Sequence, residues 1–104
     1  MAEGSRKVVV TGSILSHPER IDELLALSLE HVRRSRTEPG CLSHAVHRDV
    51  EDPLRLVFVE EWADRAALLA HFAVPASRAF VKAAAACAVG APSMALYEVD
   101  TLKL

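Results

Sequence analysis

The 104 residues of this chain suffice for one domain, because two domains of half this length would each be too small to bury a core. We therefore expect a single domain over residues 1–104, with its core within about 7–102. The net charge of −2, with the signs interspersed, argues against nucleic acid or an anionic membrane as a partner. No apolar run approaches the roughly 18 residues that span a bilayer.

The apolar content is high for a small soluble monomer, at 51% of residues and a mean hydropathy of +0.18. Such an excess predicts an interface between copies of the chain, a ligand cavity, or both. The two cysteines, Cys41 and Cys87, occur without a visible secretory signal. We therefore expect reduced thiols and a cytoplasmic protein.

The first half of the chain predicts a strand and then a helix. Residues 8–15 form a continuous run rich in β-branched residues, which is typical of a strand buried on both faces. Ser16 and Glu19 have the spacing of a capping box, and the helix after them runs to about Arg36, where Pro39-Gly40 follows. The residues expected on its buried face are Ile21, Leu24, Leu25, Ser28, Leu29 and Val32. This assignment places His31 on the polar side, exposed to solvent.

The second half predicts a hairpin, a broken helix and a last strand. The expected elements are strands over 41–50 and 54–62 joined by a turn at 51–53, a helix from the N-cap Asp64 to about Phe72, a helix from Pro75 to near Gly90, and a strand over 94–102. The order βαββαβ predicts an α+β, ferredoxin-like sandwich: a four-stranded antiparallel sheet with its helices on one side. The expected strands at 8–15 and 54–62 do not alternate between apolar and polar residues. We therefore expect a second copy to cover the open face of the sheet in a homodimer.

The strand over 54–62 places one carboxylate in an otherwise apolar row. Period two puts Leu56, Phe58, Glu60 and Trp62 on one face and Val57, Val59 and Glu61 on the other. Glu60 then either pairs with a cation or titrates at high pH and serves a site. Trp62 at the end of the strand is suited to covering a pocket.

Two further histidine patterns are candidates for chemistry. Leu68, Leu69 and Phe72 are expected to face the sheet, which leaves His71 at the flank of that apolar stripe or at a pocket mouth. Cys41, His44 and His47 have a spacing that suggests metal ligands, but residues three apart on a strand point to opposite faces. We therefore predict no metal site. The sequence also lacks glycine-rich nucleotide-binding motifs, so no bound cofactor is predicted.

Several segments together resemble the antibiotic biosynthesis monooxygenase family. They are Glu38-Pro39-Gly40-Cys41-Leu42, His47-Arg48-Asp49 with Asp52-Pro53, Glu60-x-Trp62-x-Asp64, Ala67-Leu68-x-x-His71, and Pro75 with Phe80. The resemblance implies a dimeric α/β barrel whose subunits each hold an apolar cavity between sheet and helices. Known members include quinol monooxygenases, polyketide anthrone oxygenases, haem-degrading enzymes and a sugar-phosphate isomerase. The haem-degrading members and the polyketide oxygenases draw on an Asn, and this chain has none.

The resemblance leads to a first hypothesis, a cofactor-independent monooxygenase acting on a small aromatic quinol or polyphenol with O2. His71 is the candidate base, Glu60 adjusts its pKa, and Trp62 orients the ring of the substrate. The candidate substrate-binding residues are His44, Phe58, Phe72 and Phe80. His44 is either a second titrating group or a residue that faces the dimer partner.

Two alternatives remain open at this point. An isomerase or proton-transfer enzyme acting on a small carbonyl compound would use the same base without oxygen, with Arg48, Arg55 and Arg78 as candidate anion-binding residues. A non-enzymatic dimer that binds an apolar small molecule would use His71 and Glu60 only as structural residues.

Overall fold

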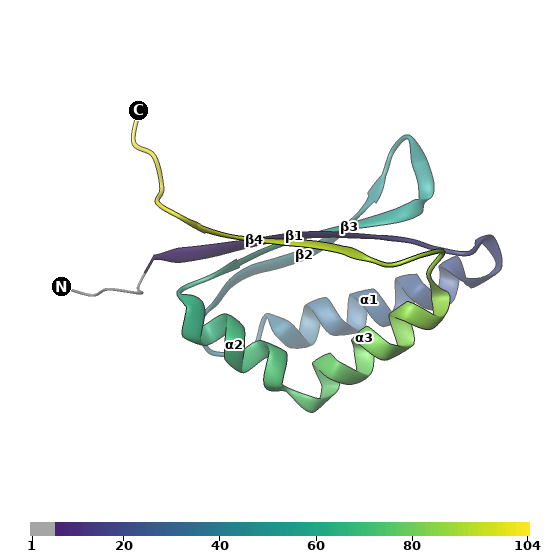
Figure 1. Ribbon diagram of the computed structural model, residues 1–104, viewed down its shortest axis with the longest axis horizontal. Helices are drawn as coiled ribbons and strands as arrows, with labels where there is room; N and C mark the ends of the chain where they lie inside the picture. The colour runs from purple at the N-terminus through teal and green to yellow at the C-terminus, as the bar shows by residue number, and fades with distance from the viewer. Residues whose placement is uncertain (1–5) are drawn as a thin grey trace.

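The computed structural model describes residues 6–104, which form one antiparallel sheet with helices packed on one of its faces (Figure 1). The elements are β1 (Lys7–Leu15), a 3-10 turn η1 (Pro18–Arg20), α1 (Ile21–Ser35), β2 (Cys41–Asp49), β3 (Asp52–Trp62), α2 (Arg65–Ala73), α3 (Pro75–Cys87) and β4 (Ser93–Val99). The predicted ferredoxin-like βαββαβ order is confirmed, including the break between the last two helices.

The sheet has the strand order β2-β3-β1-β4, and every neighbouring pair is antiparallel. The face under the helices carries the core, and its buried strand residues include Val8, Val10, Ile14, Leu56, Phe58 and Trp62. The period-two prediction for β3 is thereby confirmed, because Leu56, Phe58, Glu60 and Trp62 are all buried.

Among residues 6–104, no element covers the opposite face of the sheet (Figure 1). Apolar side chains lie on it: Val9 and Val57 are half-buried, while Val59 and Tyr97 are 37% and 53% exposed. The expectation that β1 is buried on both faces is therefore not met within one chain. The sheet of a single chain is also open, with β2 and β4 as its two edges.

The start of the first helix differs from the predicted capping box. The Ser16 hydroxyl donates to the His17 carbonyl instead of capping a helix, and Pro18 opens the short turn η1. Helix α1 then begins at Ile21, with Asp22 and Glu23 in its first turn, where the helix dipole favours negative charge. Its end at Ser35 agrees with the prediction to within a residue.

Three other element boundaries also differ from the predicted ones, and in each case the pairing of the backbone explains the difference. The hairpin turn is tighter than predicted, since Asp49 already pairs with Asp52. Helix α3 ends at Cys87 because Ala88 bridges to Ser16 and the N–H of Val89 donates to the Leu15 carbonyl. Strand β4 ends at Val99 because its partner β1 begins opposite it, at Lys7.

The loop after α1 packs tightly against α2. Gly40 has a φ of +81°, and a Cβ at this position would lie 2.5 Å from the Ala67 Cβ. Its carbonyl accepts a hydrogen bond of 2.8 Å from the N–H of Ala63. Glycine is therefore required here both for the backbone conformation and for the close approach. This approach places Glu38, two residues before Gly40, beside α2.

Helix α2 begins as predicted, with Asp64 as its N-cap. The carboxylate accepts a 2.8 Å hydrogen bond from the N–H of Ala67, which satisfies one of the free donors of the first turn. Within the described residues, no helix is long and apolar enough to cross a membrane.

Candidate functional site

A cavity of about 590 Å³ lies between the sheet and the helices α2 and α3. Its walls are largely apolar and include the three phenylalanines of the chain, Phe58, Phe72 and Phe80. The polar side chains of His31, Glu60 and His71 also line it. A cavity of this kind, apolar with a few convergent polar groups, is typical of a small-molecule site.

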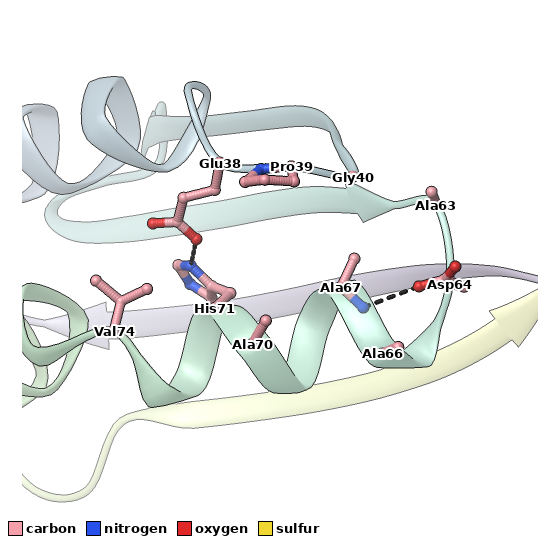
Figure 2. A pocket seen from close by; sticks show the side chains of 10 residues that line it. All are labelled: Glu38, Pro39, Gly40, Ala63, Asp64, Ala66, Ala67, Ala70, His71 and Val74. Atoms are coloured by element: carbon pink, nitrogen blue, oxygen red, sulfur yellow. Dashed lines mark hydrogen bonds and ion pairs between the residues drawn. The ribbon is translucent and has the colours of Figure 1, made fainter.

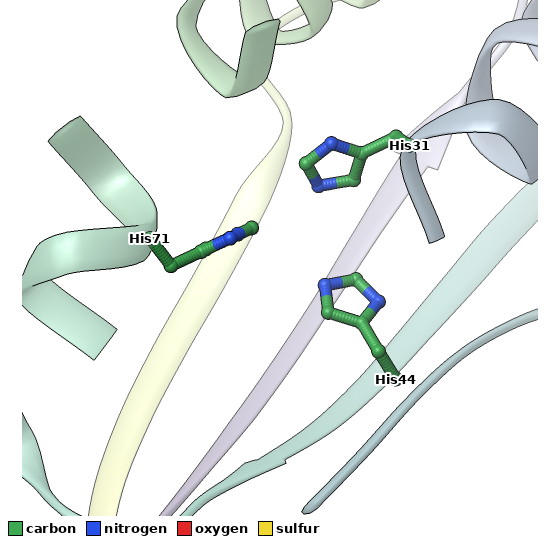
Figure 3. Close-up of side chains that lie close together, drawn as sticks. All are labelled: His31, His44 and His71. Atoms are coloured by element: carbon green, nitrogen blue, oxygen red, sulfur yellow. The ribbon is translucent and has the colours of Figure 1, made fainter. Parts of the chain in front are cut away.

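Three buried histidines converge beside this cavity from three different elements (Figure 3). His31 comes from α1, His44 from β2 and His71 from α2, and each side chain belongs to a residue at most 5% exposed. One ring nitrogen of each lies within 4.8 Å of the corresponding nitrogens of the other two. Such a cluster of imidazoles can move protons or hold a metal ion.

His71 is held by a carboxylate that sequence reasoning did not identify. Its Nδ1 lies 2.8 Å from Oε1 of Glu38, a residue of the loop before β2 (Figure 2). An ionised carboxylate only accepts, so Nδ1 carries the proton and Nε2 keeps its lone pair. Within residues 6–104, no hydrogen bond is formed by this Nε2.

Glu60 pairs with Trp62 and His44 rather than with His71. The indole N–H of Trp62 donates to Oε1 of Glu60 over 2.9 Å, and Nε2 of His44 lies 3.3 Å from the same oxygen. Burial raises the pKa of Glu60, but the contact with His44 and the hydrogen bond from Trp62 outweigh it, so the pKa lies below its usual value. The alternative that Glu60 titrates at high pH is therefore wrong, because the contact with His44 and the hydrogen bond from Trp62 stabilise its charged form.

His31 is kept neutral by its surroundings. Burial, with repulsion from the neighbouring rings and from Arg34, lowers the pKa of His31 from 6.5 to about 3. The ring stacks on Phe80 with their centres 4.1 Å apart, and its Nδ1 accepts from Nη2 of Arg34 over 2.8 Å. Because the ring is neutral, one of its two nitrogens has a lone pair, and a proton or a metal ion can bind only to that nitrogen.

The prediction that His31 is exposed to solvent is wrong, because the residue is 5% exposed. The buried face of α1 is centred on Leu24, Ser28, His31 and Ser35, while Leu29, expected to be buried, is 39% exposed. These buried residues recur at the helical intervals of three and four. The helical spacing from Leu24 therefore indicates that His31 lies on the buried face, although a polar residue such as histidine is more often exposed.

Of the two positions expected for His71, the flank of the apolar stripe is wrong, while a position at a pocket agrees with its place in the cavity wall. His71 is 4% exposed and shares the inward face of α2 with Leu68, while Leu69, which was expected to face the sheet, is 58% exposed. His71 follows Leu68 by three residues, so both occupy one face of the helix.

His44 and Cys41 correct two further expectations about β2. A register shift between Cys41 and Ser43 lets both Cys41 and His44 pair with inward-facing residues of β3, Trp62 and Glu60. They therefore share the inner face, and His44 does not point to the open face, where a dimer partner was expected. His47 is exposed and takes no part in the histidine cluster.

Trp62 and His44 do not line the cavity, although both are among the predicted site residues. The Trp62 side chain is fully buried, and His71 packs over it with the ring centres 4.6 Å apart. Neither residue is placed to stack on a bound molecule. Trp62 instead contacts Glu60 and His71, and His44 contacts Glu60, so both help to position these side chains.

Of the three arginines suggested as an anion-binding set, Arg78 lines the cavity. Arg55 instead lies 3.8 Å from Asp49 near the hairpin turn, and Arg48 is exposed on β2. The structure therefore does not bring the three together.

The fold and the cavity together define a small α+β protein with a buried histidine cluster. The profile of the antibiotic biosynthesis monooxygenase family matches residues 7–83. The chain belongs to this family. Membership indicates a monooxygenase-like or small-molecule-binding function.

Similar proteins agree with this assignment. An uncharacterized protein of Synechocystis is 39% identical over 75 residues, which are 72% of this chain and 51% of that protein, so the chain spans about half the length of this relative. The crystal structure of an antibiotic biosynthesis monooxygenase is 34% identical, with a TM-score of 0.84 over 90% of this chain and 99% of that one. A conserved protein of Methanosarcina mazei, 21% identical, has a TM-score of 0.87 over 93% and 96% of the two chains, which supports the fold alone.

Proposed function

We propose that this protein is a cofactor-independent monooxygenase that oxidises a small aromatic quinol or polyphenol with O2. The observation that carries the proposal is the apolar cavity with His71 in its wall, whose Nδ1–H is held by Glu38. Family membership supports the reaction class, and the cavity volume of about 590 Å³ accommodates an aromatic molecule of one to three rings.

His71 acts as the base in this proposal. Glu38 fixes the tautomer in which Nε2 has the free lone pair and stabilises the imidazolium that forms when Nε2 takes a phenolic proton. This role corresponds to that of the carboxylate in a catalytic dyad. Glu60, assigned in the sequence analysis to adjust the pKa of His71, instead positions the cluster through His44 and Trp62.

The oxidation needs no further reductant, because both pairs of electrons come from the substrate. The phenolate transfers one electron to O2, and the two radicals combine to form a carbon–oxygen bond and a peroxide. The O–O bond then breaks, so that one oxygen atom remains in the product and the other leaves as water. A quinol and O2 thus give a hydroxyquinone and water.

The phenylalanines of the cavity supply the binding of the ring. Phe58, Phe72 and Phe80 approach from β3, α2 and α3, so a flat apolar molecule contacts aromatic side chains from more than one side. The apolar lining also excludes water, which favours electron transfer from a desolvated phenolate.

The functional unit in this proposal is a homodimer formed through the open face of the sheet. Proteins of this family are commonly dimeric, and apolar residues such as Val57 and Val59 lie on that face. Packing the two sheets face to face removes these side chains from water.

The test is oxygen uptake by protein kept in a chelator, measured against a panel of quinols and polyphenols. Wild type should consume O2 faster than the substrate autoxidises, and His71→Ala should lose about 10²-fold or more of this rate. His17→Ala, which removes an exposed histidine outside the cluster, should retain the full rate. Full turnover by His71→Ala would contradict the assignment of the base. If no substrate supports uptake, the monooxygenase proposal fails.

A proton-transfer enzyme is a second candidate, and the position of Arg78 in the cavity favours it. A guanidinium there suits an anionic group on the substrate. Turnover that continues unchanged without oxygen would identify this reaction class.

A further inference from the structure

We propose that His31, His44 and His71 form a binding site for one transition-metal ion of the Zn²⁺ or Cu²⁺ type in each chain. Neutral imidazole is a preferred ligand for these ions, and three histidines with an open fourth position are a known arrangement for zinc. The proposal rests on the geometry of three rings that come from α1, β2 and α2 (Figure 3).

The distances between the rings agree with those around a tetrahedral ion. An ion bound to Nε2 at about 2.1 Å lies about 3.2 Å from the centre of the ring, and a tetrahedral angle then separates two ring centres by about 5.2 Å. The observed separations are 5.3 Å for His31 and His44, 5.3 Å for His31 and His71, and 5.6 Å for His44 and His71. The three rings therefore already surround a position of the required size.

The nitrogen atoms need only a small adjustment. They lie within 4.8 Å of one another, whereas ligand atoms of a tetrahedral zinc ion are about 3.4 Å apart. Rotations of the rings that move each nitrogen by about 1 Å close this gap. Oε1 of Glu60 is already 3.3 Å from Nε2 of His44, the separation of two ligands on one ion.

His44 is the independent sign of a missing ligand. The residue is 1% exposed, and both of its ring nitrogens are buried: Nδ1 has no partner, and Nε2 has only the 3.3 Å contact with Oε1 of Glu60, which does not have the geometry of a hydrogen bond. A buried imidazole left in this way costs free energy, because its two ring nitrogens have lost water without a fully formed hydrogen bond in its place. An ion on one nitrogen would satisfy the lone pair.

His71 already has the tautomer that a metal requires. Glu38 accepts from its Nδ1 at 2.8 Å, which leaves the lone pair on Nε2. A carboxylate that orients a histidine in this way is the usual support of a metal ligand, since it fixes the ring and makes it more basic.

His31 completes the site after one rearrangement. Arg34 donates to its Nδ1, so the proton now lies on Nε2 and must leave this atom for a metal to bind there. Arg34 also lies 3.3 Å from the Ser77 hydroxyl, which it retains as a partner when it turns away from His31. The tautomer of His31 can then change.

The cavity provides access and an open coordination position. His31, Glu60 and His71 line it, so an ion can enter from this side and keep one position for water or a small ligand. The carboxylates of Glu38 and Glu60 compensate the positive charge of the ion. The ion would bind to Nε2 of His71, the atom proposed above as the base. Because this lone pair could then no longer take a proton, binding of the ion should inhibit oxygen uptake.

The test is a titration of chelator-treated, metal-free protein without substrate, so its result does not depend on the proposed function. Zn²⁺ should bind with a stoichiometry of one ion per chain in calorimetry, and Co²⁺ should give the intense visible absorption of a tetrahedral site. His44→Ala and His71→Ala should each weaken Zn²⁺ binding at least about tenfold, while His17→Ala leaves it unchanged.

A measurement on the wild type keeps the test valid if a variant fails to fold. Electron paramagnetic resonance of the Cu²⁺-loaded protein should show coupling to three imidazole nitrogens. Absence of Zn²⁺ binding by the wild type, or binding that His44→Ala and His71→Ala leave intact as folded proteins, would overturn the proposal. Coupling to fewer than two nitrogens would overturn it as well.

Discussion

His71 and Glu38 are 33 residues apart in the sequence, yet their side chains form a 2.8 Å contact. The histidine side chain is 4% exposed and the carboxylate 14%, so water screens the pair only weakly. A carboxylate in this position both orients the ring and stabilises its protonated form. The base proposed here is therefore a pair of residues rather than a single histidine.

At the residue scale, Glu38→Gln should lower the turnover number of the proposed oxidation by about 10- to 100-fold. Glutamine still accepts a hydrogen bond from Nδ1, but it lacks the negative charge that stabilises the imidazolium. Since Glu38 does not line the large cavity, KM should change little. Steady-state oxygen uptake separates the two parameters.

Glu23→Gln is the matched control for this prediction, because Glu23 of α1 pairs with Arg20 of η1 at the exposed surface. It should keep the wild-type rate. If Glu38→Gln raises KM and leaves the turnover number intact, Glu38 binds substrate and does not support a base.

At the scale of elements, the loop between α1 and β2 positions Glu38 because Gly40 lets it approach α2. Gly40→Ala should destabilise the protein by about 2–4 kcal/mol, since it combines a strained positive φ with a contact of 2.5 Å to Ala67. Thermal unfolding followed by circular dichroism should show a decrease in Tm of order 10 °C.

Gly90 offers a control with the same backbone strain and no contact. Its φ is +74°, and a Cβ there would meet no atom within 4 Å. Gly90→Ala should therefore cost only about 1 kcal/mol. Equal losses in the two variants would show that close packing of the loop on α2 contributes nothing.

At the scale of the whole molecule, the uncovered face of the sheet is the feature that the chain alone does not explain. Val59 is in β3, one of the two central strands of the sheet, and is 37% exposed in a single chain. If two sheets pack face to face, Val59→Lys puts a charge into an apolar interface and should weaken self-association by about 10²-fold, or about 3 kcal/mol.

Light scattering coupled to size-exclusion chromatography measures this effect. Wild type should elute with the mass of a dimer and Val59→Lys with that of a monomer at the same concentration. Val50→Lys, at a hairpin position that is 98% exposed, should remain dimeric. A monomeric wild type, or a dimeric Val59→Lys, would exclude the open face as the interface.

The sequence by itself determined the order of the elements and the two faces of β3. The side chains of strand β3 point alternately to its two faces, Asp64 caps the start of α2, and Pro39-Gly40 follows the end of α1, so each of these features depends on residues close in the chain. Strand and helix spacing placed Phe58 and Phe72 on defined faces, whereas Phe80 was a candidate only through the resemblance to the family, and all three line the cavity. Local periodicity is sufficient for such features.

Only the tertiary structure decided how the polar residues of the site are paired. The partner of His71 is Glu38 and not Glu60, and the cluster of His31, His44 and His71 joins three separate elements. Spacing along a single strand could not reveal this cluster, because contacts between elements depend on helix packing and on the bulge near Cys41. Buried polar side chains take their partners from whatever the fold brings within about 3 Å, and that proximity is not encoded in any local pattern.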